Sequence, residues 1–266
     1  DTEALKNFLI IVGSPLGARP KALIKFDSTN NRVSTLPTAA GDDWLVKFPA
    51  RGENQSVCAA EHVYAQLAKQ CGLNMPDTQF FDLGSGYGAF GVKRFDRDNG
   101  MRIHVHTLAG LLNTNFRLPT LSYTQLLRCI RALTHSELEV IQGYRQCVFN
   151  VVFHNRDDHS KNFSFMMDSV GNWALSPAYD LSFNTGLNGE HNTDIMGEGK
   201  NIKLKHLLDL AKNSDIKLAT AKGIIEHTVS IASNLNHDLS HYPIDAALRE
   251  HICQHVQKNI NRLKSE

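Results

Sequence analysis

The chain has 266 residues, of which 42% are hydrophobic and 21% are charged, close to ordinary globular usage. This composition excludes disordered, collagen-like and coiled-coil proteins, and the length is enough for one large domain or two lobes with a substantial core. The 28 basic and 27 acidic side chains nearly cancel, so the net charge gives no reason to expect direct binding to nucleic acid or to an anionic membrane.

No apolar run reaches the roughly 18 residues that a membrane-spanning helix needs, and we expect no membrane association. The five cysteines are widely spaced and form no CxxC pair, which indicates reduced thiols in a cytoplasmic protein. The sequence starts at Asp1 with neither an initiator methionine nor a secretory signal, and we expect a piece trimmed from a longer chain.

Up to about residue 107 the sequence is rich in turns and in short runs of β-forming residues. These runs predict strands at residues 22–26, 44–48, 78–83, 89–95 and 102–106. One helix is expected among them, over residues 55–71, with Gly72 placed to end it. The glycine-rich segment at 84–88 looks like a nucleotide motif, but no helix follows it, so it predicts a hairpin turn.

The predicted helix carries Glu61 on the same face as the apolar Tyr64 and Ala68. A carboxylate inside an apolar stripe is costly without a cationic partner. Lys47 is equally out of place, because it interrupts the apolar strand at 44–48. We expect the two charges to pair; in the alternative interpretation, Glu61 lies at the edge of the stripe, in water.

Beyond about residue 122 the apolar pattern becomes helical. Ser136 is expected to cap a buried helix that ends near Phe153. A polar loop at residues 154–162 then leads into a β-hairpin that ends at Asp180. Further helices are predicted over residues 202–212, 215–234 and 243–263, with Ser214 as a cap and Pro243 at a helix start.

These elements together predict an α+β fold with two lobes. Residues 1–107 form a small β-rich lobe with one key helix, and residues 108–266 form a larger, mostly helical lobe that carries the polar loop and the hairpin. Ligands usually bind in the cleft between such lobes.

The densest polar cluster lies between the buried helix and the hairpin. It places Asp157 five residues before Asn162, and Asp180 follows the hairpin. This is the layout of a phosphoryl-transfer site, in which one aspartate accepts the hydroxyl proton and an asparagine and a second aspartate hold Mg²⁺. Lys161 is placed to neutralise the γ-phosphate. In the alternative interpretation, the cluster is a solvated acidic turn.

The β-rich lobe should then supply a phosphate cover and a lysine. The loop at residues 13–21 is punctuated by Gly and Pro and is suited to presenting backbone N–H groups to phosphate oxygens, although it is not a Walker A motif. A strand lysine paired to a helix glutamate, here Lys47 and Glu61, is the corresponding feature of protein-kinase-like folds.

These motifs resemble the HipA-like serine/threonine kinases, toxins of bacterial toxin–antitoxin systems. The matching segments are SPLGARPKALI (14–24), WLVKFP (44–49), AEHVYAQLAKQCGLNMP (60–76), RFDR (94–97), DDHSKNFS (157–164) and SPAYDL (176–181). The resemblance implies a protein-kinase-like fold with ATP as co-substrate and Mg²⁺ as cofactor. Asp157 becomes the catalytic base, assisted by Lys161, and Asn162 and Asp180 become the metal ligands.

The resemblance also assigns the nucleotide site. The residues implied in ATP binding are Ser14, Gly17, Ala18, Lys21, Lys47, Glu61, Lys93, Phe95, Asp96 and His159. Among them, Lys93 and Phe95 would meet adenine through their backbone, and Asp96 and His159 would lie near the ribose or phosphates. Ser14 matches a position where such kinases phosphorylate themselves, which ejects the glycine-rich loop.

The chain departs from the family pattern at three points. Asp158 stands where the family usually has Gly, and we expect it to add a negative charge that acts on the neighbouring base or recruits a cation. Lys93 replaces a commoner acidic residue. The family's full-length members carry a further N-terminal subdomain before the glycine-rich loop, and only about a dozen residues precede it here. We expect that subdomain to be absent, cleaved or supplied by a separate chain.

By resemblance, the protein is a growth-inhibiting toxin with an antitoxin partner and a protein substrate, with a translation component such as an aminoacyl-tRNA synthetase as one candidate. Two alternatives remain open. A small-molecule phosphotransferase of the antibiotic or sugar type shares the same two aspartates and asparagine, and a pseudokinase would bind ATP without turnover.

Overall fold

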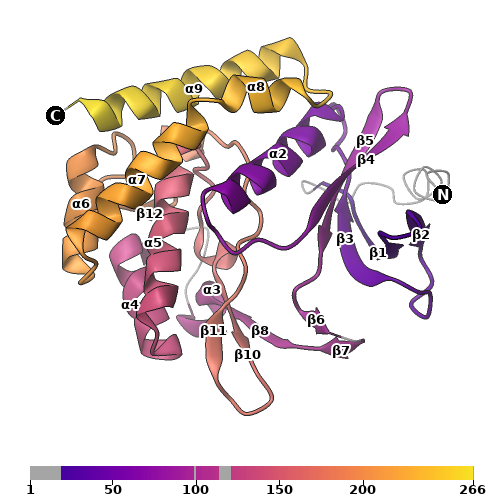
Figure 1. The fold of residues 1–266 in the computed structure, drawn as a ribbon, viewed down its shortest axis with the longest axis horizontal. Helices are drawn as coiled ribbons and strands as arrows, with labels where there is room; N and C mark the ends of the chain where they lie inside the picture. Colours follow the sequence, from indigo (N-terminus) through magenta and orange to yellow (C-terminus); the bar gives the residue numbers. More distant parts are fainter. Residues whose placement is uncertain (1–18, 99, 114–120, 266) are drawn as a thin grey trace.

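The computed structural model describes residues 19–98, 100–113 and 121–265, which form a mixed helix and sheet fold. In Figure 1 an antiparallel sheet lies on one side, a group of helices lies on the other, and α2 lies between them. The sheet contains β1 (Lys21–Asp27), β2 (Arg32–Ser34), β3 (Asp42–Lys47), β4 (Thr78–Gly84) and β5 (Tyr87–Lys93). Their spatial order is β2-β1-β3-β5-β4.

Side-chain alternation gives this sheet its own hydrophobic cluster. Ala22, Ile24 and Phe26 of β1 are buried and pack with Trp44 and Val46 of β3. This is the period-two pattern of a strand with one covered face. The hairpin predicted at residues 84–88 is confirmed, because the chain turns from β4 to β5 through three successive positive φ angles there.

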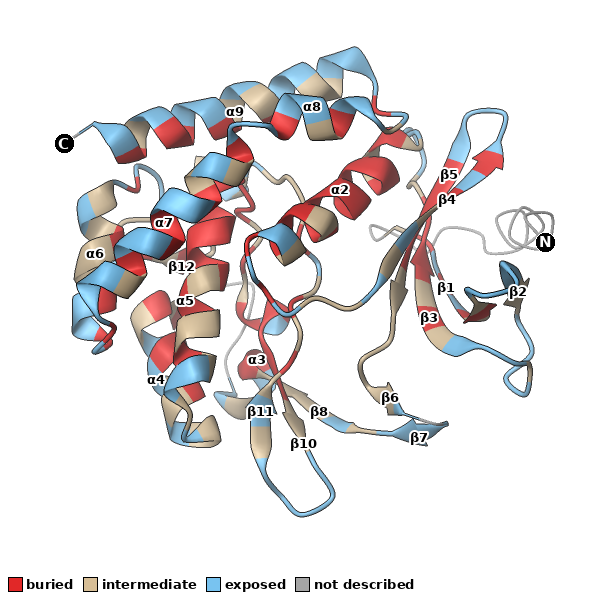
Figure 2. Cartoon of the chain, viewed as in Figure 1, coloured by how far each residue is buried: buried red, intermediate tan, exposed pale blue. Residues whose placement is uncertain are grey.

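Helix α2 (Ser56–Gln70) confirms the predicted helix over residues 55–71, and Gly72 follows its end with φ +80°. Figure 2 shows it buried along most of its length. Cys58 and Ala65 pack on Phe90 of β5, and Tyr64 belongs to the core of the helical part. Because α2 is covered on two sides, its small side chains allow both layers to approach closely.

Hydrogen bonds fix α2 to the helical part at its middle and at both ends. The Tyr64 hydroxyl donates to the Phe153 carbonyl at 2.8 Å. Near the first turn, the Ser56 hydroxyl donates to Asp245 Oδ2 at 2.9 Å and accepts from the Asp245 amide at 3.0 Å. Near the last turn, the Gln70 carbonyl lies 3.0 Å from His227 Nε2. The helix is therefore held by the helical core as well as by the sheet.

The helical part is built from a group of α-helices that share one large hydrophobic core. They are α3 (Leu108–Leu111), α4 (Tyr123–Thr134), α5 (Glu137–Val152), α6 (Leu204–Asn213), α7 (Leu218–Ala232), α8 (Leu235–Ser240) and α9 (Ala246–Lys264). Within the described ranges, no helix combines the length and apolar character needed to cross a bilayer.

The predicted start of α5 at Ser136 and its end at Phe153 are confirmed, and the Ser136 hydroxyl accepts from the Glu139 amide. Two other helix-boundary predictions are wrong. Ser214 ends α6 instead of capping the next helix, which begins at Leu218. Pro243 lies before the start of α9, where the Asp245 carboxylate accepts from the Leu248 amide and caps the helix.

A second, three-stranded sheet carries the predicted hairpin. Its strands are β8 (His104–Thr107), β10 (Ser164–Met167) and β11 (Trp173–Leu175), in the order β11-β10-β8. The polar loop before β10 contains a single 3-10 turn, η1 (Ser160–Asn162). The remaining short elements are β6 (Arg97–Asp98), β7 (Met101–Arg102), β9 (Leu121–Ser122), β12 (Thr193–Asp194) and η2 (Leu187–Gly189).

The anchoring of α2 gives a stability prediction. Tyr64→Phe removes the hydroxyl that satisfies the buried Phe153 carbonyl, and it should lower the free energy of unfolding by about 1–2 kcal/mol in urea titrations. Tyr87→Phe is the matched control, because Tyr87 is 60% exposed at the tip of β5. Equal effects of the two substitutions would contradict the anchoring role of Tyr64.

Candidate functional site

A cavity of about 380 Å³ lies between the five-stranded sheet, α2 and the chain that leads into and out of the three-stranded sheet. Among the residues predicted for the site, those that line it are Lys21, Lys47, Glu61, Lys93, Phe95, Asp96 and Asp180. Asp157, His159, Lys161 and Asn162 are outside its lining and lie on the loop before β10. Ser14, Gly17 and Ala18 lie outside the described residues.

Lys47 joins three elements in the lining of this cavity. Its ammonium Nζ lies 2.6 Å from Glu61 Oε1 of α2 and also pairs with Asp180 Oδ1, which follows the hairpin. The predicted ion pair between Lys47 and Glu61 is therefore confirmed. The pairing with Asp180 brings together residues 133 positions apart in sequence.

The charge state of Lys47 follows from these contacts. Burial by itself acts to lower the pKa of Lys47, but the carboxylates of Glu61 and Asp180 outweigh burial and raise it above its ordinary value. The ammonium is therefore fixed in its charged form. Arg19 adds a second cation, with Nη1 3.5 Å from Glu61 Oε2.

Asp180 adopts a left-handed backbone conformation, with φ +55°, which aspartate tolerates better than most side chains. Its partial burial acts to raise its pKa, but Lys47, with weaker help from Lys21 and His159, lowers the pKa below its usual range. The carboxylate is consequently ionised at neutral pH. The effect of His159 also indicates that this side chain of the polar loop lies near Asp180.

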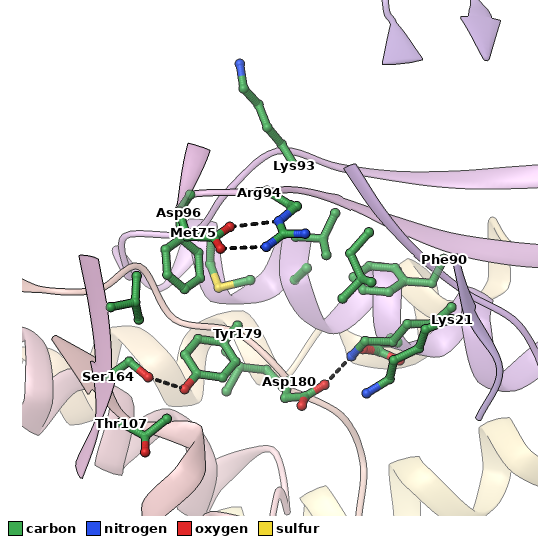
Figure 3. Close-up of a pocket in the computed structure, with 18 residues that line it drawn as sticks. Lys21, Met75, Phe90, Lys93, Arg94, Asp96, Thr107, Ser164, Tyr179 and Asp180 are labelled. Carbon is green, nitrogen blue, oxygen red and sulfur yellow. Dashed lines mark hydrogen bonds and ion pairs between the residues drawn. The ribbon is translucent and has the colours of Figure 1, made fainter. Parts of the chain in front are cut away.

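Aromatic and ionic contacts form another part of the cavity lining. The Phe95 ring lies 5.6 Å from the Tyr179 ring, between centroids. Arg94 donates to the Asp96 carboxylate from two of its guanidinium nitrogens, Nε at 2.8 Å and Nη2 at 2.6 Å. Figure 3 shows the Lys93 side chain pointing away from the cavity, and its Nζ pairs with Asp42 at 2.7 Å. Lys93 therefore faces the cavity through its backbone.

The polar loop is folded back on itself. The Asn162 side-chain amide donates to the Asp157 carbonyl at 2.7 Å, so its Oδ1 is the atom that can ligate a cation. His159 Nε2 lies 3.9 Å from Asp157 Oδ1. The Tyr179 hydroxyl donates to the Lys161 carbonyl at 2.5 Å, which ties the residue before Asp180 to the residue before Asn162. The loop and the segment after the hairpin are thus adjacent.

Asp158 has a role that the sequence did not indicate. Its carboxylate is buried and accepts from the Tyr123 hydroxyl at 2.8 Å and from the Asn192 amide at 2.8 Å, and it lies 2.9 Å from His191 Nδ1. It therefore points into the protein and holds the loop in place. Asn192 and His191 were also missed, because their partners lie 33 to 35 residues away and leave no local pattern.

Asn162 and Asp180 carry the donor atoms that a Mg²⁺ site would use. Asn162 and Asp180 offer an amide oxygen and a carboxylate, the hard oxygen ligands that Mg²⁺ prefers. In the described part of the chain, no group of three His, Cys, Asp or Glu side chains converges as a metal site. Mg²⁺ usually takes about two protein ligands when substrate phosphates and water complete its coordination shell. The donor chemistry of Asn162 and Asp180 therefore fits this ion.

The sequence profile of the HipA-like C-terminal domain matches residues 13–235. The chain belongs to this family. Its curated relatives include a protein named "Putative kinase Y4dM" from Sinorhizobium fredii, 28% identical over an alignment of 190 residues that covers 62% of this chain and 46% of the relative. Another, named "Putative kinase", is from Haemophilus influenzae and is 25% identical over an alignment of 172 residues that covers 59% of this chain and 47% of the relative. The HipA-like chain spans about half the length of these relatives.

Solved structures resemble the fold of this chain. HipA of Shewanella oneidensis, determined with HipB and operator DNA, covers 99% of this chain with a TM-score of 0.73 and 19% identity, over 71% of its own length. The Helicobacter pylori kinase CtkA covers 85% of the chain with a TM-score of 0.57 and 15% identity, over 89% of its own length. At these identities the likeness is one of fold.

The buried ion pair gives a second stability prediction. Lys47→Met leaves the buried Glu61 without its nearest cation and should lower the free energy of unfolding by about 3 kcal/mol in urea titrations. Adding Glu61→Gln removes the unpaired charge and should restore part of that loss. Lys25→Met is the control, since the Lys25–Asp43 pair is more exposed and should cost less than about 1 kcal/mol. A loss at Lys47 no larger than at Lys25 would contradict the pairing argument.

Proposed function

We propose that this HipA-like chain is the catalytic part of an ATP- and Mg²⁺-dependent serine/threonine protein kinase. In this proposal the chain has two lobes, residues 1–107 and 108–266, and the cavity between them is the nucleotide site. The observation that carries the proposal is the position of Lys47, which joins Glu61 of α2 to Asp180 in the lining of that cavity. Kinases use such a lysine to hold nucleotide phosphates.

The cavity suits an adenine ring. Apolar side chains from both sheets, from α2 and the loop that follows it, and from the segment after the hairpin surround it, namely Leu45, Ala65, Met75, Val92, Val105 and Leu181. Lys93 and Phe95 line the cavity, and adenine would meet them through backbone groups. Asp96, whose carboxylate accepts from Arg94, would lie near the ribose or phosphates.

The phosphates would lie toward the charged end of the cavity. Lys47 and Lys21 supply positive charge there, and the proposed glycine-rich loop, with Ser14, Gly17 and Ala18, would cover the phosphates. Asn162 and Asp180 would hold Mg²⁺, which neutralises charge that develops on the transferred group. His159, near both Asp157 and Asp180, is proposed to contact the same phosphates.

In the transfer step, Asp157 accepts the proton of a serine or threonine hydroxyl as the hydroxyl oxygen forms its bond to the γ-phosphorus. The bond from that phosphorus to the β,γ-bridging oxygen breaks, and ADP leaves with its electron pair. Lys161 compensates charge on the moving phosphoryl group. The Asp157 side chain is 49% exposed, so an acceptor can reach it.

The biological setting is proposed from the family. A toxin of this type would act in the cytoplasm on a protein, with an aminoacyl-tRNA synthetase as one candidate, and phosphorylate itself on Ser14. An antitoxin and a separate chain resembling the N-terminal subdomain are proposed as partners, in keeping with the HipB that accompanies the HipA of S. oneidensis.

Asp157→Asn tests the proposed base. The amide keeps the shape of the carboxylate but accepts no proton, so kcat should fall about 100- to 10,000-fold while the Kd for Mg-ATP stays within about twofold. Phosphate transfer from γ-labelled ATP to the protein itself and to casein, with calorimetry for binding, measures both. Asp215→Asn, at an exposed carboxylate, is the matched control. Wild-type turnover of the Asp157 variant would remove Asp157 from this role.

A further inference from the structure

The segment that follows Asp180 packs against the polar loop, and none of its residues has a role in the proposed chemistry. The Arg156 amide donates to the Asn184 carbonyl, and the Asn184 amide donates to the His154 carbonyl, each at 3.1 Å. The Arg156 guanidinium donates to the Gly189 carbonyl and, at 3.0 Å, to the Lys200 carbonyl. Residues 184–200 are thus attached to the loop along much of their length.

The backbone of this segment lies very close to neighbouring atoms at Gly186. Gly186 has φ +71°, and a Cβ at that position would lie 2.1 Å from the Glu190 carbonyl oxygen and 2.8 Å from Arg156 Cβ. Only glycine fits there. The path of the chain between Asp180 and β12 is therefore set by packing against Arg156.

Asp158 then fixes the end of the segment. Its Oδ1 accepts from the amides of Asn192 and Thr193, at 2.8 and 3.3 Å, and its Oδ2 accepts from the Tyr123 hydroxyl. Burial, and next the Asp158 carboxylate, raise the pKa of Tyr123, so the phenol remains a hydrogen-bond donor. Asn150 donates in turn to the Tyr123 oxygen at 2.9 Å. The backbone at Asn192 is consequently held by a buried and well-satisfied polar network.

From this fixed backbone the Asn192 side chain reaches the proposed base. Its Nδ2 donates to the Arg156 carbonyl at 3.0 Å and lies 3.4 Å from Asp157 Oδ1. A side-chain amide has two N–H donors, and the two acceptors use one each. Asn192 is half-buried, whereas the Asp157 carboxylate is largely open to solvent on its other side.

We propose that Asn192 is a positioning residue, which orients the Asp157 carboxylate toward the acceptor hydroxyl. This proposal rests on the proposed function, since it requires Asp157 to be the base. A half-exposed carboxylate samples several side-chain orientations, and one fixed donor restricts it to those in which the other oxygen faces the substrate. Misplacement of a catalytic group by about 1 Å costs on the order of 100-fold in rate.

Asn192→Ala tests the proposal. It removes both side-chain donors but keeps the backbone amide that Asp158 holds, so kcat should fall about 10- to 100-fold. The Kd for Mg-ATP should stay within about twofold, because Asn192 does not line the cavity. Asn201→Ala, at an exposed asparagine nearby, is the matched control and should leave kcat unchanged. If Asn192→Ala does not fold, as judged by its melting temperature, Asn192→Ser keeps a polar side chain too short to reach Asp157 and should show the same loss.

A double-mutant cycle separates positioning from general damage. If Asn192 acts through Asp157, adding Asn192→Ala to Asp157→Asn should lower the residual rate by less than twofold. A full additional loss in that background, or a kcat of the Asn192 variant within twofold of wild type, would overturn the proposal. Normal turnover of Asp157→Asn alone would instead overturn the proposed base, so the two failures are distinguishable.

Discussion

The rest of the site depends on the ion pairs of the Lys47 ammonium. This group is buried, and it is stable there only because carboxylates from α2 and from the segment after the hairpin neutralise its charge. Glu61 can reach it only if α2 keeps its place. The bonds of Tyr64 and Asp245 fix that helix to the helical core. The position of the lysine in the cavity is thus determined by packing far from the cavity.

A second constraint holds the polar loop. The Asp157 side chain is about half exposed, at 49%, whereas its neighbour Asp158 is directed inward and accepts from donors in two parts of the chain, at Tyr123 and at residues 191–192. The Asp158 carboxylate is used for structure, and the Asp157 carboxylate is the one that solvent can reach. In the proposed kinase, the cavity residues would bind the nucleotide, and the hydrogen bonds of Asp158 would fix the position of the base, Asp157. Substitutions in the cavity would therefore change nucleotide binding, and substitutions around Asp158 would change turnover.

Local residue patterns and misplaced charges in the sequence were enough to predict α2, one ion pair and one turn. The bounds of α2 followed from its apolar face and Gly72. The pair of Lys47 and Glu61 followed from two charges that each interrupt an apolar pattern, and the alternative of a solvated Glu61 is excluded by its burial. The hairpin turn at residues 84–88 followed from its glycines. The prediction of Asp158 as a charge acting on the base did not identify its inward hydrogen bonds, because its partners are distant in sequence. Helix starts at Ser214 and Pro243 failed because a good capping residue can also end a helix or precede one.

In the proposed kinase, the cavity at Lys47 binds a nucleotide whose metal ion lies between Asn162 and Asp180. Crystals of the intact protein grown with a non-hydrolysable ATP analogue and Mn²⁺ in place of Mg²⁺ would locate this ion, because Mn²⁺ is identified by its anomalous scattering. We expect one Mn²⁺ site within ligand distance of Asn162 Oδ1 and the Asp180 carboxylate, with adenine beside Phe95. A nucleotide bound elsewhere, or a metal that touches neither side chain, would contradict it.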